Sequence, residues 1–354
     1  MNFRHTLFIF AIVSMLLALP TVQAHTPTTA GENESLDTAK IINDPTKSWA
    51  IYAELHEGGE AQYYKFDLEA GQTILVELFI PTDPSLGDFT PSFVLMGHDI
   101  ESSGVVPDFV EVPEGEGALV VNGIKPDQAT FEPFSPGSFY TLAKIVMDAP
   151  STDTYYVAVF EPSQGGRYGL AIGEREAFTI DEFILIPINV IMVHQWEGQN
   201  VALIFTPLIV TVVVGYALIF WRWRPLRSLK LIEWAGSLAG LIFLGTGAMA
   251  FTQMAIALTA APAGAELIVT VMFAIFPIIL GIVTLLAALR PERRTIIRTR
   301  IYLVILGILA LFAWTGLIVG PVMAFVASVL PIKMIQESET KTKTQTKATP
   351  QESK

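Results

Sequence analysis

The sequence predicts a β + α membrane protein, with an antiparallel β-sandwich of the jelly-roll kind outside the membrane and a bundle of four transmembrane helices after it. Only 16% of its 354 residues are charged and 51% are hydrophobic, whereas soluble domains have roughly 25% charged residues. Residues 25–180 are acidic, with 25 Asp and Glu against 7 Lys and Arg. The apolar runs long enough to cross a bilayer follow this segment, which predicts two domains in two environments.

The first 24 residues have the pattern of a secretory signal peptide. A weakly positive start precedes the apolar stretch 7–19, and small residues stand at cleavage-site spacing before His25. An uncleaved anchor is the alternative interpretation. Some copper enzymes bind metal through an N-terminal histidine, but the polar segment 25–44 predicts a flexible leader, in which Asn33 begins an exposed glycosylation sequon. The chain has no cysteine, which excludes disulfides and thiol chemistry.

Residues 45–178 have the pattern of an antiparallel β-sandwich. Short apolar runs, several of them alternating, are separated by Gly and Pro, and no long amphipathic helix interrupts them. The predicted strands are 63–68, 73–80, 92–97, 117–123, 138–147, 155–160 and 168–172. We expect a tight turn at Gly71 with a positive φ, and a hairpin of the last two strands that turns at Gly165 and Gly166.

Three stretches of this segment carry a family resemblance. They are "EAQYYKFDLEAGQTILVELFIP", "FTPSFVLMGHD" and "APSTDTYYVAVFEPSQGGRYGLAIG", and over residues 45–173 they resemble the pre-peptidase C-terminal (PPC) domain. Asp153 and Thr154 stand where that family often has Gly-Thr. The resemblance implies a secreted, non-catalytic β-sandwich that is often appended to enzymes for binding or targeting. Because the shared positions are turns and core, they indicate a fold and not a chemistry.

Residues 179–200 predict a helical collar at the outer membrane face. Eleven mostly apolar residues span only about 17 Å as a helix, too short to cross a bilayer. Thr179 and Glu182 match a capping box, Pro187 bends the helix, and the rings of His194 and Trp196 favour the headgroup level.

Four apolar runs after the collar are long enough to cross a bilayer, namely 201–221, 234–258, 267–289 and 301–330. The first and last of the three loops between them are basic, and the middle loop is not. The basic residues are Arg222, Arg224, Arg227, Lys230, Arg290, Arg293, Arg294, Arg298 and Arg300. Basic loops stay cytoplasmic, so we expect a multi-pass plasma-membrane protein with its β domain outside.

The last apolar run leaves two interpretations open. Gly320-Pro321 predicts a kink in one long helix, which would leave the disordered polar tail 332–354 outside. A broken, re-entrant pair that returns the tail inward is the alternative. Pairs of glycines four residues apart, Gly236 with Gly240 and Gly316 with Gly320, predict close helix packing, either within the bundle or with another membrane subunit.

No catalytic signature and no charged residue at membrane depth is found in the sequence. Carboxylates near His98 do not match a calcium-loop spacing, so no catalytic residue, metal or cofactor is predicted. These carboxylates are Asp83, Asp88, Asp99 and Glu101.

We therefore expect a non-enzymatic integral membrane protein that displays its β domain as a binding, sensory or accessory-subunit module. Its expected partners are the lipid bilayer and another membrane or extracytoplasmic protein, while the acidic β domain repels nucleic acid. A transporter or transporter subunit is the first alternative. The second is a metal-dependent extracellular enzyme, for which His25, His56 and His98 would have to cluster.

Overall fold

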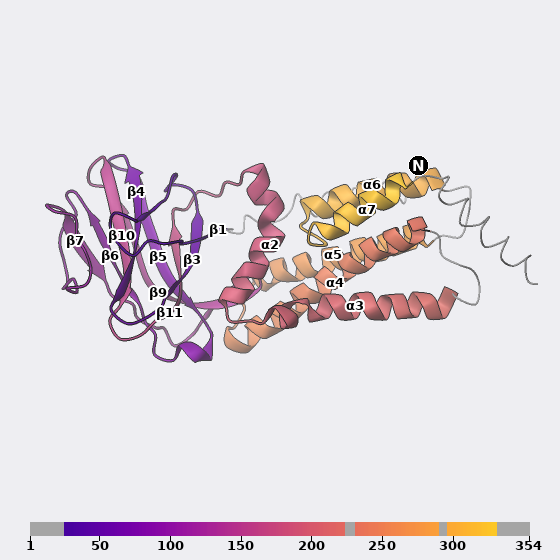
Figure 1. The fold of residues 1–354 in the computed structure, drawn as a ribbon, viewed down its shortest axis with the longest axis horizontal. Coiled ribbons are helices and arrows are strands. Elements are labelled where there is room, and N and C mark those ends of the chain that lie inside the picture. Colours follow the sequence, from indigo (N-terminus) through magenta and orange to yellow (C-terminus); the bar gives the residue numbers. More distant parts are fainter. Residues whose placement is uncertain (1–24, 224–230, 290–295, 331–354) are drawn as a thin grey trace, which may run out of the picture. The chain divides into compact units, whose positions relative to one another are not determined.

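The computed structural model describes residues 25–223, 231–289 and 296–330 (Figure 1). A β-rich N-terminal domain with mixed sheets is followed by helices, three of which are long and apolar enough to cross a membrane. The chain divides into two compact units, Met1–Val201 with Gln253–Thr270, and Ala202–Thr252 with Val271–Lys354. The predicted signal peptide and polar tail lie outside the described residues, as do six of the nine basic loop residues. Those six are Arg224, Arg227, Lys230, Arg290, Arg293 and Arg294.

In the part of the first unit that the structure describes, eleven strands form two sheets. The strands are β1 (Thr26–Thr29), β2 (Lys40–Ile41), β3 (Trp49–Leu55), β4 (Glu60–Leu68), β5 (Thr73–Pro81), β6 (Ser92–Gly97), β7 (Gly117–Val121), β8 (Thr130–Glu132), β9 (Gly137–Asp148), β10 (Asp153–Glu161) and β11 (Gly166–Ile172). The six-stranded sheet has the order β1-β3-β11-β5-β9-β8, and the five-stranded sheet has the order β2-β4-β10-β6-β7. The pairs β1–β3 and β2–β4 are parallel, whereas the other strand pairs are antiparallel.

The chain alternates between the two sheets, and this differs from the predicted hairpins. The strands β4 and β5 meet at a turn where Gly71 has the expected positive φ of 85°, but they belong to different sheets. The strands β10 and β11 are likewise in different sheets, so the predicted hairpin is wrong. Alternation of apolar residues identifies a strand and its buried face, but it does not identify the strand's partner.

The segment predicted as a flexible leader belongs to the folded domain. It supplies β1 and β2, which pair with the edges of β3 and β4 and so cover backbone groups that would otherwise be unpaired. Asn33 is fully buried, and its amide donates a hydrogen bond to the Tyr63 carbonyl at 3.0 Å. The expectation that Asn33 is an exposed glycosylation site is therefore wrong for the folded domain.

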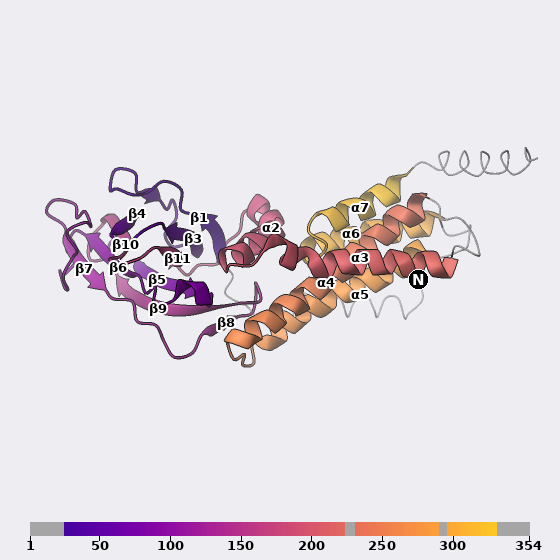
Figure 2. The same cartoon turned by 60° about the horizontal axis from the view of Figure 1, so that its bottom comes forward.

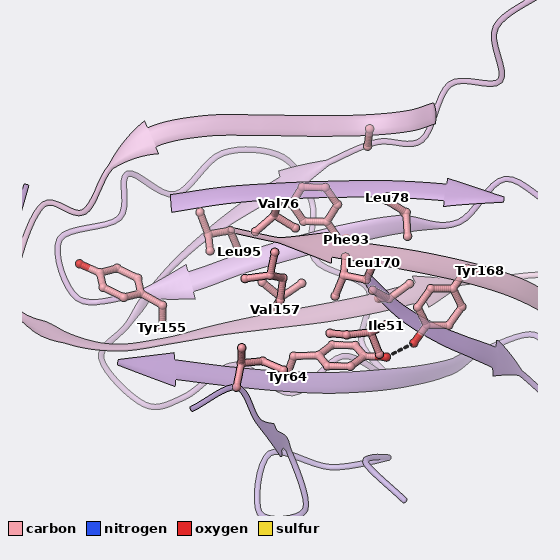
Figure 3. Packing of buried hydrophobic residues seen from close by; sticks show 14 of the residues in the cluster. Ile51, Tyr64, Val76, Leu78, Phe93, Leu95, Tyr155, Val157, Tyr168 and Leu170 are labelled. Carbon is pink, nitrogen blue, oxygen red and sulfur yellow. Dashed lines mark hydrogen bonds between the residues drawn. The ribbon is translucent and has the colours of Figure 1, made fainter. Parts of the chain in front are cut away.

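One apolar core is shared by the two sheets (Figure 3). Val76 and Leu170 from the six-stranded sheet and Phe93 from the five-stranded sheet are fully buried in it. The hydroxyls of Tyr64 and Tyr168 lie 2.6 Å apart, and Tyr168 donates to Gln62 Oε1 at 2.7 Å. Buried tyrosines thus contribute apolar area while their polar ends remain satisfied.

Within the described residues, six helices follow the strands. They are α2 (Ile180–Trp196), α3 (Val201–Trp223), α4 (Leu231–Ala260), α5 (Leu267–Ala288), α6 (Ile296–Phe312) and α7 (Val319–Val329). Helices α3, α4 and α5 are the three that could span a membrane, and they correspond within a few residues to the first three predicted spans. Arg222 lies in the last turn of α3, and Arg298 and Arg300 lie in the first two turns of α6.

The fourth predicted span is two helices and not one. Helices α6 and α7 lie side by side (Figures 1 and 2), and the Arg300 guanidinium donates to the Leu330 carbonyl, so the hairpin returns to the end where it began. The chain turns between them at Trp314, Gly316, Leu317 and Ile318, all with positive φ. Gly320-Pro321 lies in the first turn of α7. A proline there does not break the helix, because the first backbone N–H groups have no partner inside the helix.

The predicted packing glycines contact neighbouring helices of the second unit. A Cβ on Gly240 would lie 3.0 Å from the Gly281 carbonyl oxygen in α5, and one on Gly236 would lie 2.8 Å from Ala288 Cβ. Gly316 and Gly320 both pack against the ring of Phe243 in α4. These contacts favour packing within the chain over an interface with another subunit.

Candidate functional site: a cavity beneath helix α2

Helix α2 begins at the capping box that the sequence predicts. The Thr179 backbone N–H donates to the Glu182 carboxylate at 2.7 Å, and the Thr179 side chain accepts from the Glu182 N–H. Glu182 also accepts from Lys47 Nζ at 2.6 Å, and the Lys47 side chain is only 8% exposed. The first turn of α2 is therefore attached to the β domain by an ion pair as well as by chain connectivity.

The end of α2 is attached by an aromatic side chain. The Trp196 indole N–H donates to the carbonyls of Ala53 in β3 (3.3 Å) and Tyr168 in β11 (3.1 Å). Its ring lies 4.9 Å from that of Tyr52 and 5.7 Å from that of Phe79. An indole that packs on two rings and has its N–H bonded anchors the helix on the sheet.

The predicted headgroup positions of the collar residues do not hold. His194 is 3% exposed, with Nδ1 2.8 Å from Glu197 Oε2, and Trp196 packs on the sheet. Pro187 is inside the helix and buried. Gly198 has a φ of 93°, which suits the end of a helix.

A cavity of about 70 Å³ lies between α2 and the six-stranded sheet. The sheet supplies side chains on the face opposite the shared core, and α2 supplies Ile186, Val190 and Val193. Four lining residues have aromatic rings that form one continuous group, with Phe79 at its centre 5.1 Å from Phe139. The four are Tyr52, Phe79, Phe139 and Trp196.

Three carboxylates from distant parts of the chain also line this cavity. Glu77 of β5 accepts from Lys144 Nζ at 2.8 Å and from the Thr141 hydroxyl at 3.0 Å. Glu197 accepts from the Ser138 backbone N–H at 3.3 Å, in addition to its contact with His194. The third carboxylate, Glu132, accepts from the Phe134 backbone N–H at 2.9 Å.

The pKa values of three lining groups are shifted by burial. Burial raises the pKa of Glu132 to about 7, and the charge of Glu197 acts in the same direction. Burial also raises the pKa of the Tyr52 hydroxyl, and Glu132 and Glu197 add to that increase. Burial lowers the pKa of His25, whose Nδ1 lies 2.5 Å from Ser48 Oγ. Glu132 therefore changes its charge close to neutral pH.

The short segment around Glu132 also contacts the connection between α4 and α5, which belongs to the same compact unit. Phe131 packs with Ala257 and Ala261, and the Thr270 hydroxyl donates to the Pro133 carbonyl at 2.7 Å. Glu132 thus stands between two residues that hold this connection.

The three histidines proposed for a metal enzyme do not come together. His56 lies with Glu34 and Glu60, and His98 lies with Glu116 and Asp153, in two separate groups of mostly exposed side chains. Within the described residues, no group close enough to share an ion contains two histidines. Of the loop carboxylates, Asp83 pairs with Arg167 and Asp99 lies 3.8 Å from His98, while Asp88 and Glu101 are exposed.

Sequence patterns did not identify the lining residues of the cavity. Glu77, Glu132 and Tyr52 are single polar residues in or beside apolar strands, and each is typical of an outward-facing strand position. The one sequence feature that pointed to this cavity was the apolar segment 179–200, because an apolar helix face is expected to pack against another surface.

Compared with known proteins, the chain matches no protein-family model and no curated protein sequence. The PPC resemblance therefore stays a prediction.

Proposed function

We propose that the chain is a non-enzymatic, multi-pass plasma-membrane protein that displays a PPC-like β-sandwich outside the cell as a binding and sensory module. The cavity beneath α2 is the observation that carries this proposal. A ligand there would touch both the sheet and α2, and only four residues separate α2 from α3, the first helix able to span a membrane. Binding would therefore act on the segment that leads into the membrane.

The proposed topology places α3, α4 and α5 across the bilayer, with the loops 224–230 and 290–295 in the cytoplasm. The α4–α5 connection then lies outside, which agrees with its contacts to Phe131 and Pro133 of the β domain. Helix α7, with 11 residues, spans about 17 Å and is too short to cross a core of about 30 Å.

We therefore propose that α6 and α7 form a re-entrant hairpin, which returns the tail to the cytoplasm. The lysines of the tail favour that side.

A binding role of the β domain is supported by two cavities among the described residues. The cavity beneath α2 and a wider groove of about 550 Å³, lined by His56, Arg167 and Asn189 among others, are both in the first unit. Their polar lining comes from the β domain and α2, and not from the helices able to span a membrane.

Cysteine labelling in intact cells tests the proposal, because the chain has no cysteine of its own and gives no background. Val105→Cys, at a position that is 88% exposed in the β domain, should react with a membrane-impermeant maleimide. Leu226→Cys in the first basic loop and Ser353→Cys in the tail should react only after the cells are opened. Protection of Val105→Cys in intact cells would overturn the proposed function, and labelling of Ser353→Cys there would overturn the re-entrant hairpin.

A further inference from the structure

We infer that the cavity beneath α2 binds a small organic cation, a substituted ammonium group, held by Glu132 and by the ring group of Tyr52, Phe79, Phe139 and Trp196. This inference rests on the proposed binding function and names the ligand class of the same site.

One of the three carboxylates around the cavity has no basic side chain beside it among the described residues. Lys144 lies on Glu77, and His194 lies on Glu197. Among the residues that the structure describes, no Lys, Arg or His lies within ion-pair distance of Glu132. A carboxylate in a low-dielectric site is costly to ionise without a counter-charge, and a bound cation supplies one.

The aromatic lining selects an organic cation. Ammonium groups with alkyl substituents are attracted to the faces of Trp, Tyr and Phe, and cages of such rings are a recurring way to bind them. The Tyr52 hydroxyl lies near Glu132 and Glu197 and makes no hydrogen bond within the described part of the chain. It is therefore available as an acceptor for an ammonium N–H.

An inorganic metal ion fits the cavity less well. The groups of His, Asp and Glu side chains that are close enough to share an ion, among described residues, include none that line this cavity. A volume of about 70 Å³ holds about five to seven water molecules at roughly 10–15 Å³ each. The ligand is therefore a compact ammonium compound, or the ammonium end of a longer one.

Cation binding at this site should depend on pH. The titratable groups that face Glu132 are Glu197, Glu77, Tyr52 and His25. Glu132 gains its charge as the pH rises through about 7, and the ionised form is the one that attracts a cation. Affinity should therefore rise about tenfold between pH 6 and pH 8, because the competent fraction rises by about that factor.

Calorimetric titration of the full-length protein in detergent tests the inference with tert-butylammonium chloride and with tert-butanol, which has the same alkyl group and no charge. We expect saturable binding of the cation at pH 8, about tenfold weaker binding at pH 6, and no binding of the alcohol. Glu132→Gln should weaken cation binding at least tenfold and remove its pH dependence. Glu114→Gln, at an exposed acidic residue away from the cavity, is the matched control and should bind as the unaltered protein does.

The outcomes separate the two proposals. Equal affinity of the Glu132→Gln variant, with its near-ultraviolet circular dichroism unchanged, would overturn the inference, as would equal binding of the alcohol. Methylammonium chloride is titrated as well, so that a tert-butyl group too large for the cavity is recognised. No heat from either cation at pH 8 would also overturn the inference, while the cysteine labelling would still test whether the β domain is displayed outside the cell.

Discussion

The β domain and the helical unit differ in the share of small side chains in their interiors. The largest fully buried residues of the β domain are tyrosines and phenylalanines, such as Tyr64, Tyr155 and Phe93. In the second unit, by contrast, the residues with no exposed area are mainly small, as are Ala239, Ala274 and Ala310. Glycines bring α4 and α5 together at Gly240 and Gly281.

This difference is the one expected if water surrounds the first unit and lipid the second, as in the proposed topology. In water, removal of large apolar surface is the main source of stability, so aromatic residues serve a sheet core well. In lipid that term is nearly absent between helices, so close backbone approach and dispersion contacts hold them together. The two units should therefore respond differently to the same kind of mutation.

The largest expected effect is the loss of an aromatic side chain from the β core. Tyr64→Ala removes a fully buried ring and leaves the Tyr168 hydroxyl without one partner, so we expect a loss of about 3–5 kcal/mol in the free energy of unfolding. Urea unfolding monitored by tryptophan fluorescence measures it. Tyr64→Phe, which keeps the ring, should lose only about 1 kcal/mol. Similar losses for the two variants would mean that the Tyr64 hydroxyl, and not its ring, supplies most of the stability.

The next effect is electrostatic and concerns Glu132. Its pKa is about 7 when folded and near 4.5 when unfolded, so between these values the folded protein holds a proton that the unfolded chain has released. Stability therefore falls as the pH rises through this window, by about 2–3 kcal/mol in all. Glu132→Gln should abolish this fall. Unfolding at pH 5 and pH 8 for both proteins measures it, and parallel pH profiles would contradict the prediction.

A smaller effect is expected from filling the glycine contact between α4 and α5. Gly240→Leu would place a side chain against Gly281 and Leu285, at a cost of about 1–3 kcal/mol from overpacking. Thermal unfolding in detergent measures the change. Val213→Leu in α3, at a position that is 62% exposed, is the matched control and should unfold as the unaltered protein does. A Gly240→Leu variant as stable as that control would show that α4 and α5 do not pack as described.

The smallest effect is expected for a hydroxyl on a spanning helix. Thr206 donates to the carbonyl of Ala202 in its own helix at 2.6 Å and is exposed. Because that carbonyl keeps its helical hydrogen bond, Thr206→Val should change the stability by less than about 0.5 kcal/mol. A loss above about 1 kcal/mol in the same thermal assay would indicate an additional role for this hydroxyl.

What the sequence could predict was local. Alternating runs located most strands, apolar length located three spans, and Thr179 with Glu182 located the start of α2. The break in the fourth apolar run was only the alternative interpretation, because apolar side chains continue through the turn near Gly316 and hydropathy carries no signal of it.

The candidate site depends on contacts that no local pattern contains. Tyr52, Glu132 and Glu197 are 65 to 145 residues apart in pairs and meet only when α2 lies on the sheet. The sequence pattern also could not predict whether two consecutive strands belong to the same sheet, since β10 and β11 lie in different sheets.

The position of β10 and β11 has a consequence for how the domain is made. The last two strands in the chain occupy interior places, β10 between β4 and β6, and β11 between β3 and β5. The five-stranded sheet cannot close until residue 161 is available, and the six-stranded sheet cannot close until residue 172 is available. Pairings of such high sequence separation form slowly. A chain that emerges from its N-terminus onward would therefore expose unpaired strands throughout its synthesis and fold in one late step, when nearly the whole domain is present.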